Sequence, residues 1–175
     1  MVKDASQLRI IHYPAAVLKH RARPLPDVTD EVRAVARKML ELMHEAPGVG
    51  LAAPQVGLNW RLFVACPTGD PKDDRVFINP VLSRPSRDLE EYEEGCLSLP
   101  DIRGQIRRPK GIAITALDLQ GEEITLEAED LAARVWQHET DHLDGVLIID
   151  RMNELDRMAN KKRLKELREE AGVLR

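Results

Sequence analysis

The chain has 175 residues, of which 43% are hydrophobic and 32% charged, and its formal net charge at pH 7 is −4. This length and apolar content are typical of one domain with its own core, so we expect a single domain over residues 1–175. The negative charge and the 3% aromatic content argue against a nucleic-acid-binding surface, and we expect no sequence-specific nucleic-acid binding. With no apolar signal core and no run of ~18 apolar residues, we expect a cytoplasmic protein without a membrane partner.

The first half of the chain contains one helix pattern and two strand patterns. Thr29 and Asp30 can cap a helix whose apolar positions follow helical spacing and which Pro47-Gly48 ends. The next stretch, 48–57, is too rich in glycine and proline for regular structure. Residues 61–66 and 75–82 are predicted strands because β-branched and aromatic residues dominate them.

The second half begins with an acidic stretch at 88–94 and a basic stretch at 103–110. Residues 111–119 and 122–126 predict a hairpin that turns at Gln120-Gly121. A helix is expected over 130–143, then a short strand at 147–149, and a charged C-terminal helix over 157–174. This order predicts an α+β fold, with short antiparallel sheets around a central helix and a C-terminal helix.

The central helix carries the string His138-Glu139-Thr140-Asp141-His142. Residues four apart share a helix face, so both histidines continue the apolar stripe of Leu131 and Val135. Buried imidazoles need partners, and a metal ion satisfies one nitrogen of each ring. Glu139 lies beside them, where a carboxylate can handle the proton of an activated water. A coincidental pattern and a structural metal site remain alternatives at this point.

Cys96 is the leading candidate for a third ligand, because no histidine or cysteine follows His142. Gly95 precedes it and lets the backbone approach a ligand closely. A set of one cysteine and two histidines leaves a tetrahedral position open, as in catalytic sites. Cys66, inside an apolar strand, is expected to be a buried hydrophobic residue.

Three separated strings carry a resemblance to a known family: GVGLAAPQVG at 48–57, EGCLSLP at 94–100 and QHETDHLDG at 137–145. Together they closely resemble the signature motifs of peptide deformylases, which hydrolyse the formyl group from the N-terminal formyl-methionine of nascent polypeptides. The resemblance runs from residues 11–14 to the C-terminal tail. Thr140 is a departure, since many relatives carry methionine there, but it points away from the two histidines.

The resemblance implies a role for each matching residue. Cys96, His138 and His142 would be the metal ligands, and Glu139 the general acid and base. Gln55 and the backbone N–H of Leu97 would stabilise the oxyanion. The family natively uses Fe²⁺, while Zn²⁺, Ni²⁺ or Co²⁺ can replace it in purified protein. A thiolate ligand suits iron and zinc alike, so the ligand types do not decide between them.

The methionine side chain of the substrate needs an apolar pocket beside the metal. Arg134 can pack its stem there with its head snorkelling to solvent, or can contact the substrate backbone. Arg103 either faces the substrate or is a solvated arginine. The residues expected to bind substrate are Val49, Gly50, Arg103, Leu131, Arg134 and Val135.

Two other functions and one further partner are weighed against this sequence. A metalloprotease with the same helix motif would need a third ligand downstream and would leave EGCLSLP unexplained. A non-catalytic peptide-binding module with a structural metal would not need all the catalytic groups. The tail at 157–175 either docks on the ribosome or is a solvated helix with i,i+4 charge pairs.

Overall fold

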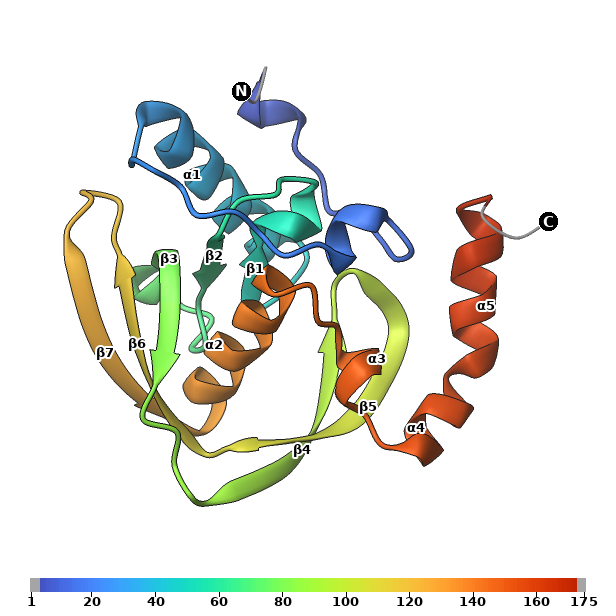
Figure 1. Ribbon diagram of the computed structural model, residues 1–175. Coiled ribbons are helices and arrows are strands. Elements are labelled where there is room, and N and C mark those ends of the chain that lie inside the picture. The colour runs from blue at the N-terminus through green and yellow to red at the C-terminus, as the bar shows by residue number, and fades with distance from the viewer. Residues whose placement is uncertain (1–3, 173–175) are drawn as a thin grey trace.

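The computed structural model describes residues 4–172. A five-stranded antiparallel sheet lies on one side of helix α2 (Asp130–Leu143), and a long two-stranded hairpin lies on the other (Figure 1). The strands of the sheet, in spatial order, are β1 (Gly50–Ala52), β2 (Leu62–Ala65), β3 (Arg75–Ser83), β6 (Gly111–Leu117) and β7 (Glu123–Glu129). The hairpin consists of β4 (Leu89–Cys96) and β5 (Leu99–Pro109). The predicted α+β class is confirmed.

The two faces of the sheet are covered by different helices. Leu62 and Val64 pack against α1 (Asp30–Glu45), whereas Phe63 and Ala65 pack with the residues of α2. Strand side chains alternate between faces, so a strand with four consecutive buried residues must have both faces covered. The sheet therefore separates two apolar layers, one under α1 and one under α2.

Helix α1 begins where the sequence predicts. The Thr29 hydroxyl accepts a hydrogen bond from the Val32 N–H at 3.3 Å and so caps the first turn. Helix α2 ends as the sequence predicts. It stops before Gly145, whose φ is +74° and whose missing side chain leaves room for the Lys19 carbonyl. Both features were readable as start and stop signals in the sequence.

A third apolar cluster lies between the hairpin and the C-terminal helices. Ile102 and Ile106 of β5 pack there with Leu164 and Leu167. The predicted C-terminal helix is in fact two helices, α4 (Glu154–Ala159) and α5 (Lys161–Glu170). They meet at Asn160, whose side-chain amide donates to the Arg103 carbonyl at 2.7 Å. Residues 173–175 of the predicted helix lie outside the described residues.

The predicted strand at 147–149 is wrong. Ile148–Arg151 forms α3, a single helical turn. The Asp150 carboxylate accepts from the Leu147 N–H at 2.8 Å and closes this turn. A three-residue apolar run cannot by itself distinguish a strand from a buried helical turn.

The glycine-rich stretch is more regular than its composition predicts. Residues Gly50–Ala52 form β1, which pairs with β2, and Ala53–Val56 form a 3₁₀ turn. The acidic and basic stretches, left without secondary structure in the sequence analysis, are β4 and β5. Within residues 4–172, no helix is both long enough and apolar enough to cross a membrane.

Candidate metal centre

Three potential metal ligands converge between α2 and the end of β4. The Cys96 Sγ lies 3.3 Å from the His142 Nε2, which lies 3.2 Å from the His138 Nε2. These separations are close to the roughly 3.3–3.6 Å expected between neighbouring ligand atoms of a tetrahedral ion. The structure therefore brings together the three residues that the sequence analysis selected.

The ring of His138 is held by a carboxylate behind it. The His138 Nδ1 lies 3.0 Å from the Glu94 Oε2, so Nδ1 is the protonated nitrogen and Nε2 faces Cys96 and His142. Burial alone would lower the pKa of His138, but its hydrogen bonds to Cys96 and Glu94 raise it. Burial and the neighbouring charge of His138 lower the pKa of His142, which keeps that ring neutral.

Glu94 is the centre of a buried charge network. Arg108 donates to both of its carboxylate oxygens, at 2.6 and 2.9 Å, and Arg134 donates to it at 2.8 Å. Burial would raise the pKa of Glu94, but the hydrogen bonds and charges of Arg108 and His138 hold it well below its usual range. Arg108 also donates to Asp141 on α2 at 2.8 Å. The network ties the hairpin to the helix that carries both histidines.

Glu139 differs from Glu94 in that one of its carboxylate oxygens has no hydrogen-bond partner among the described residues. Its residue is 4% exposed, and its Oε2 has no hydrogen-bond partner among the described residues. Burial raises the pKa of Glu139 to about 7. A carboxyl group whose pKa lies near neutral pH can both accept and return a proton at that pH.

Gln55 is held with its amide nitrogen toward Cys96. The Gln55 Oε1 accepts from the Ala52 N–H at 2.8 Å, which leaves Nε2 facing the Cys96 Sγ at 3.6 Å and the Ser98 Oγ at 3.3 Å. The 3₁₀ turn after β1 creates this geometry, because it folds the side chain back over the strand end. Gln55 therefore offers a fixed donor at the edge of the centre.

Two glycines let the chain pass close to these groups. A Cβ at Gly50 would lie against the Glu139 carboxylate, and a Cβ at Gly48 would lie 2.8 Å from a methyl group of Leu97. Leu97 directly follows Cys96, so its backbone N–H belongs to the turn that carries the thiol. Only glycine fits at position 50 without displacing Glu139.

If Glu139 carries a proton as the sequence predicts, replacing Gly50 by alanine should lower the rate of that chemistry by about 100-fold, the usual cost of misplacing a reacting group by ~1 Å. The cause is the contact with the Glu139 carboxylate. We therefore expect the loss chiefly in this rate, and less in the melting temperature. Gly111→Ala is the matched control, because a Cβ there meets only ordinary contacts at 3.6 Å. Equal rates for both variants would show that Gly50 does not position Glu139.

The residues expected to bind substrate fall into two groups. Val49 and Leu131 are large apolar side chains that remain 38% and 48% exposed, while Val135 is buried in the layer under α2. Arg103 is exposed on β5, paired with Gly95, and its guanidinium lies over the space where a Gly95 Cβ would be. Val49 thus adjoins Gly50, which faces Glu139, and Arg103 lies against Gly95, next to Cys96, whereas Leu131 is exposed in the first turn of α2.

The expectation for Arg134 needs correction. Its side chain is 7% exposed, so its head does not snorkel to solvent. The guanidinium donates to Glu94 and to the carbonyls of Ile106 and Glu90, both at 2.9 Å. These bonds hold Arg134 inside the protein and leave its expected contact with the substrate backbone without support. Sequence reasoning missed Glu94 and Arg108, although the facing acidic and basic stretches contained the signal.

Comparison with known proteins decides the family. The polypeptide deformylase family model matches residues 7–158, which include the whole centre described above. The chain belongs to the polypeptide deformylase family. The three strings noted in the sequence fall inside the matched region, so the resemblance read from them is confirmed.

Individual deformylases match most of the chain. The peptide deformylase of Rhodopirellula baltica is 46% identical over 84% of this chain and 74% of its own length. That of Caulobacter vibrioides is 44% identical over 89% of this chain and 91% of its own length. A crystal structure of the Plasmodium falciparum peptide deformylase superposes with a TM-score of 0.91, with 33% identity over 94% of this chain and 98% of that one.

Deformylases depend on a metal ion, and the donor set of this chain fits one. Two buried imidazole nitrogens face each other and a thiol, an arrangement that a divalent cation satisfies better than shared protons do. The unpartnered Glu139 oxygen beside them fits the same conclusion. One thiolate and two neutral imidazoles suit Fe²⁺ and Zn²⁺ alike.

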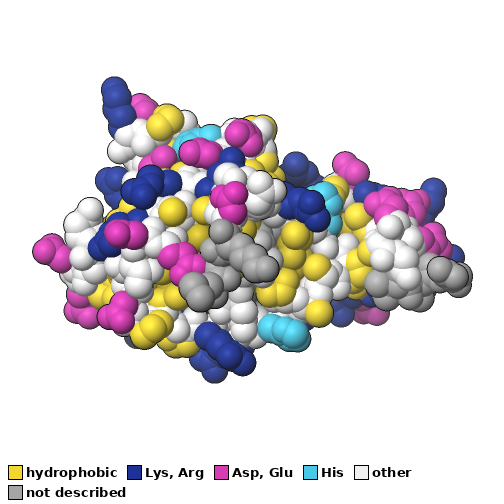
Figure 2. Space-filling model, turned by 90° about the horizontal axis from the view of Figure 1, so that it is seen from above, with side chains coloured by type: hydrophobic (Ala, Val, Ile, Leu, Met, Phe, Trp, Pro, Cys, Tyr) yellow, Lys and Arg dark blue, Asp and Glu magenta, His cyan; other side chains and the backbone are white. Residues whose placement is uncertain are grey.

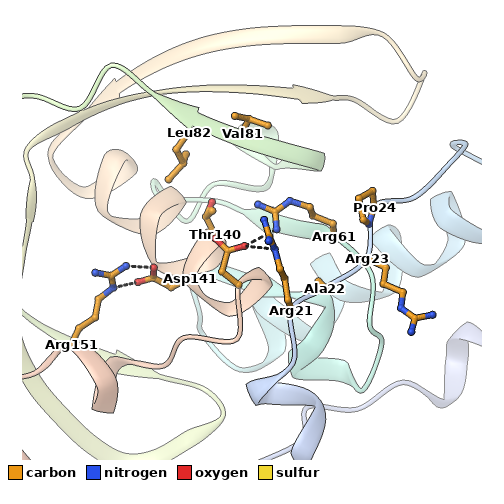
Figure 3. Close-up of a pocket in the computed structure, with 11 residues that line it drawn as sticks. Arg21, Ala22, Arg23, Pro24, Arg61, Val81, Leu82, Thr140, Asp141 and Arg151 are labelled. Carbon is orange, nitrogen blue, oxygen red and sulfur yellow. Dashed lines mark hydrogen bonds and ion pairs between the residues drawn. The ribbon is translucent and has the colours of Figure 1, made fainter.

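The opposite side of α2 in this deformylase is lined by other residues. Thr140 and Asp141 border a hollow of about 770 Å³, together with Val81 and Leu82 of β3 (Figure 3). The Thr140 hydroxyl is buried there without a partner among the described residues. Since neither His138 nor His142 borders this hollow, Thr140 faces away from the two histidines, as the sequence analysis expected.

Proposed function

We propose that Cys96, His138 and His142 hold the metal ion with which this deformylase removes the formyl group from the N-terminal formyl-methionine of nascent polypeptides and releases formate. The observation that carries the proposal is the convergence of one sulfur and two ring nitrogens beside a buried carboxylate with a free oxygen. We assign Fe²⁺ as the ion, on the resemblance to the family; zinc, nickel or cobalt fit the same ligands. When bound, the ion supplies Lewis acidity to a carbonyl oxygen and to water.

Glu139 moves the proton in the proposed mechanism. Its Oε2 takes a proton from the attacking water, which adds to the formyl carbon. When the C–N bond breaks, Glu139 returns the proton to the departing amine, so formate and a free methionine amino group result. Burial raises the pKa of Glu139, which suits a group that must hold a proton between the two transfers.

Gln55 and Leu97 stabilise the charge that develops on the formyl oxygen. The Gln55 Nε2 is already aimed at the centre by the bond that its oxygen accepts from Ala52. The Leu97 N–H is the second proposed donor. A donor of this kind typically contributes about 10²–10³ in rate because it is fixed before the charge forms.

The substrate methionine is proposed to lie among Val49, Leu131 and Val135, with the peptide running past Gly50. Val49 and Leu131 expose apolar surface that the methionine side chain would cover. Arg103 is the proposed contact for the peptide backbone or for a downstream residue. Val49, Gly50 and Arg103 are supported by their position next to Glu139 and Gly95, and Leu131 and Val135 by the family resemblance; we propose that the single domain contains all of them.

Formate release from formyl-Met-Ala-Ser, compared with acetate release from acetyl-Met-Ala-Ser, tests the function. After anaerobic purification we expect rapid release of formate only, and about one iron in the centre per chain. Comparable hydrolysis of the acetyl peptide or of internal peptide bonds would instead favour a general metalloprotease. Absence of any hydrolysis in the iron-loaded protein would favour a non-catalytic peptide-binding module.

Replacing Cys96 by alanine should remove iron from the centre and abolish deformylation, because two histidines alone make a weak site. Iron content by elemental analysis after anaerobic loading checks this. His20→Ala is the control, since His20 is exposed and belongs to neither group of potential metal ligands, so its loss should leave the iron content unchanged. Unchanged iron in the Cys96 variant would remove that residue from the ligand set.

We also propose that the enzyme works in the cytoplasm and that α5 contacts the ribosome, where formylated chains emerge. Five basic residues support the proposal: Lys161, Lys162, Arg163, Lys165 and Arg168. Acidic side chains stand among them at that end of the molecule (Figure 2), and Arg163 is paired with Glu170 at 2.8 Å. Lys161→Glu/Lys162→Glu should weaken co-sedimentation with ribosomes and spare the buried leucines; unchanged co-sedimentation would end the proposal.

A further inference from the structure

A second group of metal-ligand side chains lies away from the deformylase centre. His44 is in the last turn of α1, Cys66 directly follows β2, and Asp74 directly precedes β3. The His44 Nε2 lies 2.8 Å from the Asp74 Oδ1, and the ligand atoms of all three residues lie within 4.8 Å of one another. Three elements that are distant in sequence thus deliver an imidazole, a thiol and a carboxylate to one point.

This group and the centre on α2 are on opposite faces of the sheet. Along β2 the side chains alternate, and Cys66 follows Leu62 and Val64 on the face that α1 covers. The deformylase ligands come from α2 and β4, on the other side of β2. An ion held by His44, Cys66 and Asp74 would therefore occupy a separate site.

Hydrogen bonds hold Cys66 in place, while the His44 and Asp74 side of the group is accessible to solvent. The Cys66 N–H donates to the Val49 carbonyl at 2.9 Å, and its thiol donates to the Asp70 carbonyl at 3.1 Å. Cys66 is fully buried, whereas the side chains of His44 and Asp74 are 29% and 21% exposed. An ion has access from the solvent side, and a water molecule can complete its coordination there.

The ligand types suit zinc. A thiolate and an imidazole suit Zn²⁺ well, and a carboxylate completes a common set of three protein ligands. Neighbouring ligands of tetrahedral zinc are roughly 3.3–3.6 Å apart. The His44–Asp74 hydrogen bond of 2.8 Å must therefore open slightly, and the sulfur, which lies within 4.8 Å of both partners, needs to approach by no more than about 1.5 Å. Side-chain rotations of this size require no change in the strands.

We propose that His44, Cys66 and Asp74 form a second metal site, which binds Zn²⁺ and links the end of α1 to the β2–β3 connection. Burial and the Asp74 carboxylate raise the pKa of the Cys66 thiol, so zinc must displace its proton on binding. Because the Cys66 N–H donates to the Val49 carbonyl, zinc here would also hold the start of the glycine-rich stretch in place. The site is independent of the proposed deformylation chemistry.

The test uses Co²⁺ as a spectroscopic substitute for zinc in metal-depleted Cys96→Ser protein. Cys66 and Cys96 are the two cysteines of the chain, so a thiolate-to-cobalt absorption band in this variant must come from Cys66. We expect the band to saturate at about one equivalent, to be displaced by Zn²⁺, and to vanish in Cys96→Ser/Cys66→Ser. In the same background, His44→Ala and Asp74→Asn should each weaken cobalt binding at least about tenfold.

His20→Ala is the matched control, because His20 is exposed and outside both groups. Circular dichroism confirms that each variant is folded, and the rim variants His44→Ala and Asp74→Asn keep the buried sulfur in place. Absence of a thiolate band in Cys96→Ser would overturn the proposal. So would a band that neither rim variant weakens, since Cys66 would then bind cobalt without the other two residues.

Discussion

Replacing Glu139 by glutamine should lower kcat for formyl-Met-Ala-Ser by about 10²–10⁴, the range lost when a general acid and base is removed. The iron content should stay unchanged, because the three converging ligand atoms belong to Cys96, His138 and His142. Glutamine keeps the shape of the side chain and removes only its ability to carry a proton. Formate release under saturating substrate, with iron measured on the same samples, checks both expectations.

The same substitution should raise the free energy of unfolding of the metal-free protein above pH 7. Loss of a side chain that only packs would lower it. In the metal-free protein the pKa of Glu139 is raised by burial to about 7, above the ~4.3 of an unfolded glutamate. Its contribution to stability is therefore complete below pH ~4 and is lost as the pH rises to about 7. Metal-free Glu139→Gln should be more stable than the metal-free wild type above pH 7.

Thr140→Val is the matched control for activity. Thr140 is the next residue on α2, its hydroxyl has no partner among the described residues, and it borders the hollow on the far side of the helix. Valine has nearly the same shape, so the rate of formate release should stay close to that of the wild type. Full activity in Glu139→Gln, or an equal loss in both variants, would contradict the proposed role of Glu139.

The central helix could be predicted from the sequence because its signals are local. Helical spacing set the shared face of His138 and His142, and Gly145 marked the end of the helix. The pairing of Cys96 with these histidines came from elimination and from the family resemblance. No local pattern indicates that the end of β4 lies against α2, since that contact depends on the tertiary fold.

The parts that could not be predicted are those that only long-range pairing creates. The acidic stretch lacks the β-branched residues typical of strands, yet it forms β4 because β5 presents basic residues opposite it, such as Arg108 facing Glu90. Arg134 was misplaced for the same reason. Its position on α2 was predicted correctly, but its partner Glu94 comes from another element 40 residues away.

Replacing Glu94 by glutamine should lower the free energy of unfolding by about 3–5 kcal/mol, because it leaves two buried guanidinium groups without their anion. Arg108 is 3% exposed and Arg134 is 6% exposed, so water cannot replace the lost carboxylate. Arg108 keeps Asp141, whereas Arg134 keeps the carbonyls of Ile106 and Glu90 and a longer contact, 3.7 Å, with the Glu90 carboxylate. For a chain of this size we expect the melting temperature to fall by about 2–4 °C per kcal/mol.

The expected pH dependence separates this charge effect from a simple packing defect. Arg108 and His138 hold the pKa of Glu94 well below the ~4.3 of an unfolded glutamate. A carboxylate with a lowered pKa stabilises the fold fully above the unfolded pKa of ~4.3. This stabilisation is lost as the pH falls from there toward the lower pKa of the folded state. The part of the stability difference between wild type and Glu94→Gln that comes from the titration of Glu94 itself should therefore narrow only below pH ~4.

Glu127→Gln is the matched control, since it also removes one carboxylate from an arginine. Glu127 pairs with Arg84 at 2.6 Å, but both side chains are more than 60% exposed, and exposed pairs contribute only about 0–1 kcal/mol. Losing the Glu94 carboxylate should also free the His138 ring and weaken iron binding by about 10–100-fold, whereas Glu127→Gln should not. Equal stability and equal iron affinity in the two variants would contradict this account. The buried Glu94 carboxylate would then neither stabilise the fold nor hold the His138 ring, and packing alone would set the geometry of the metal centre.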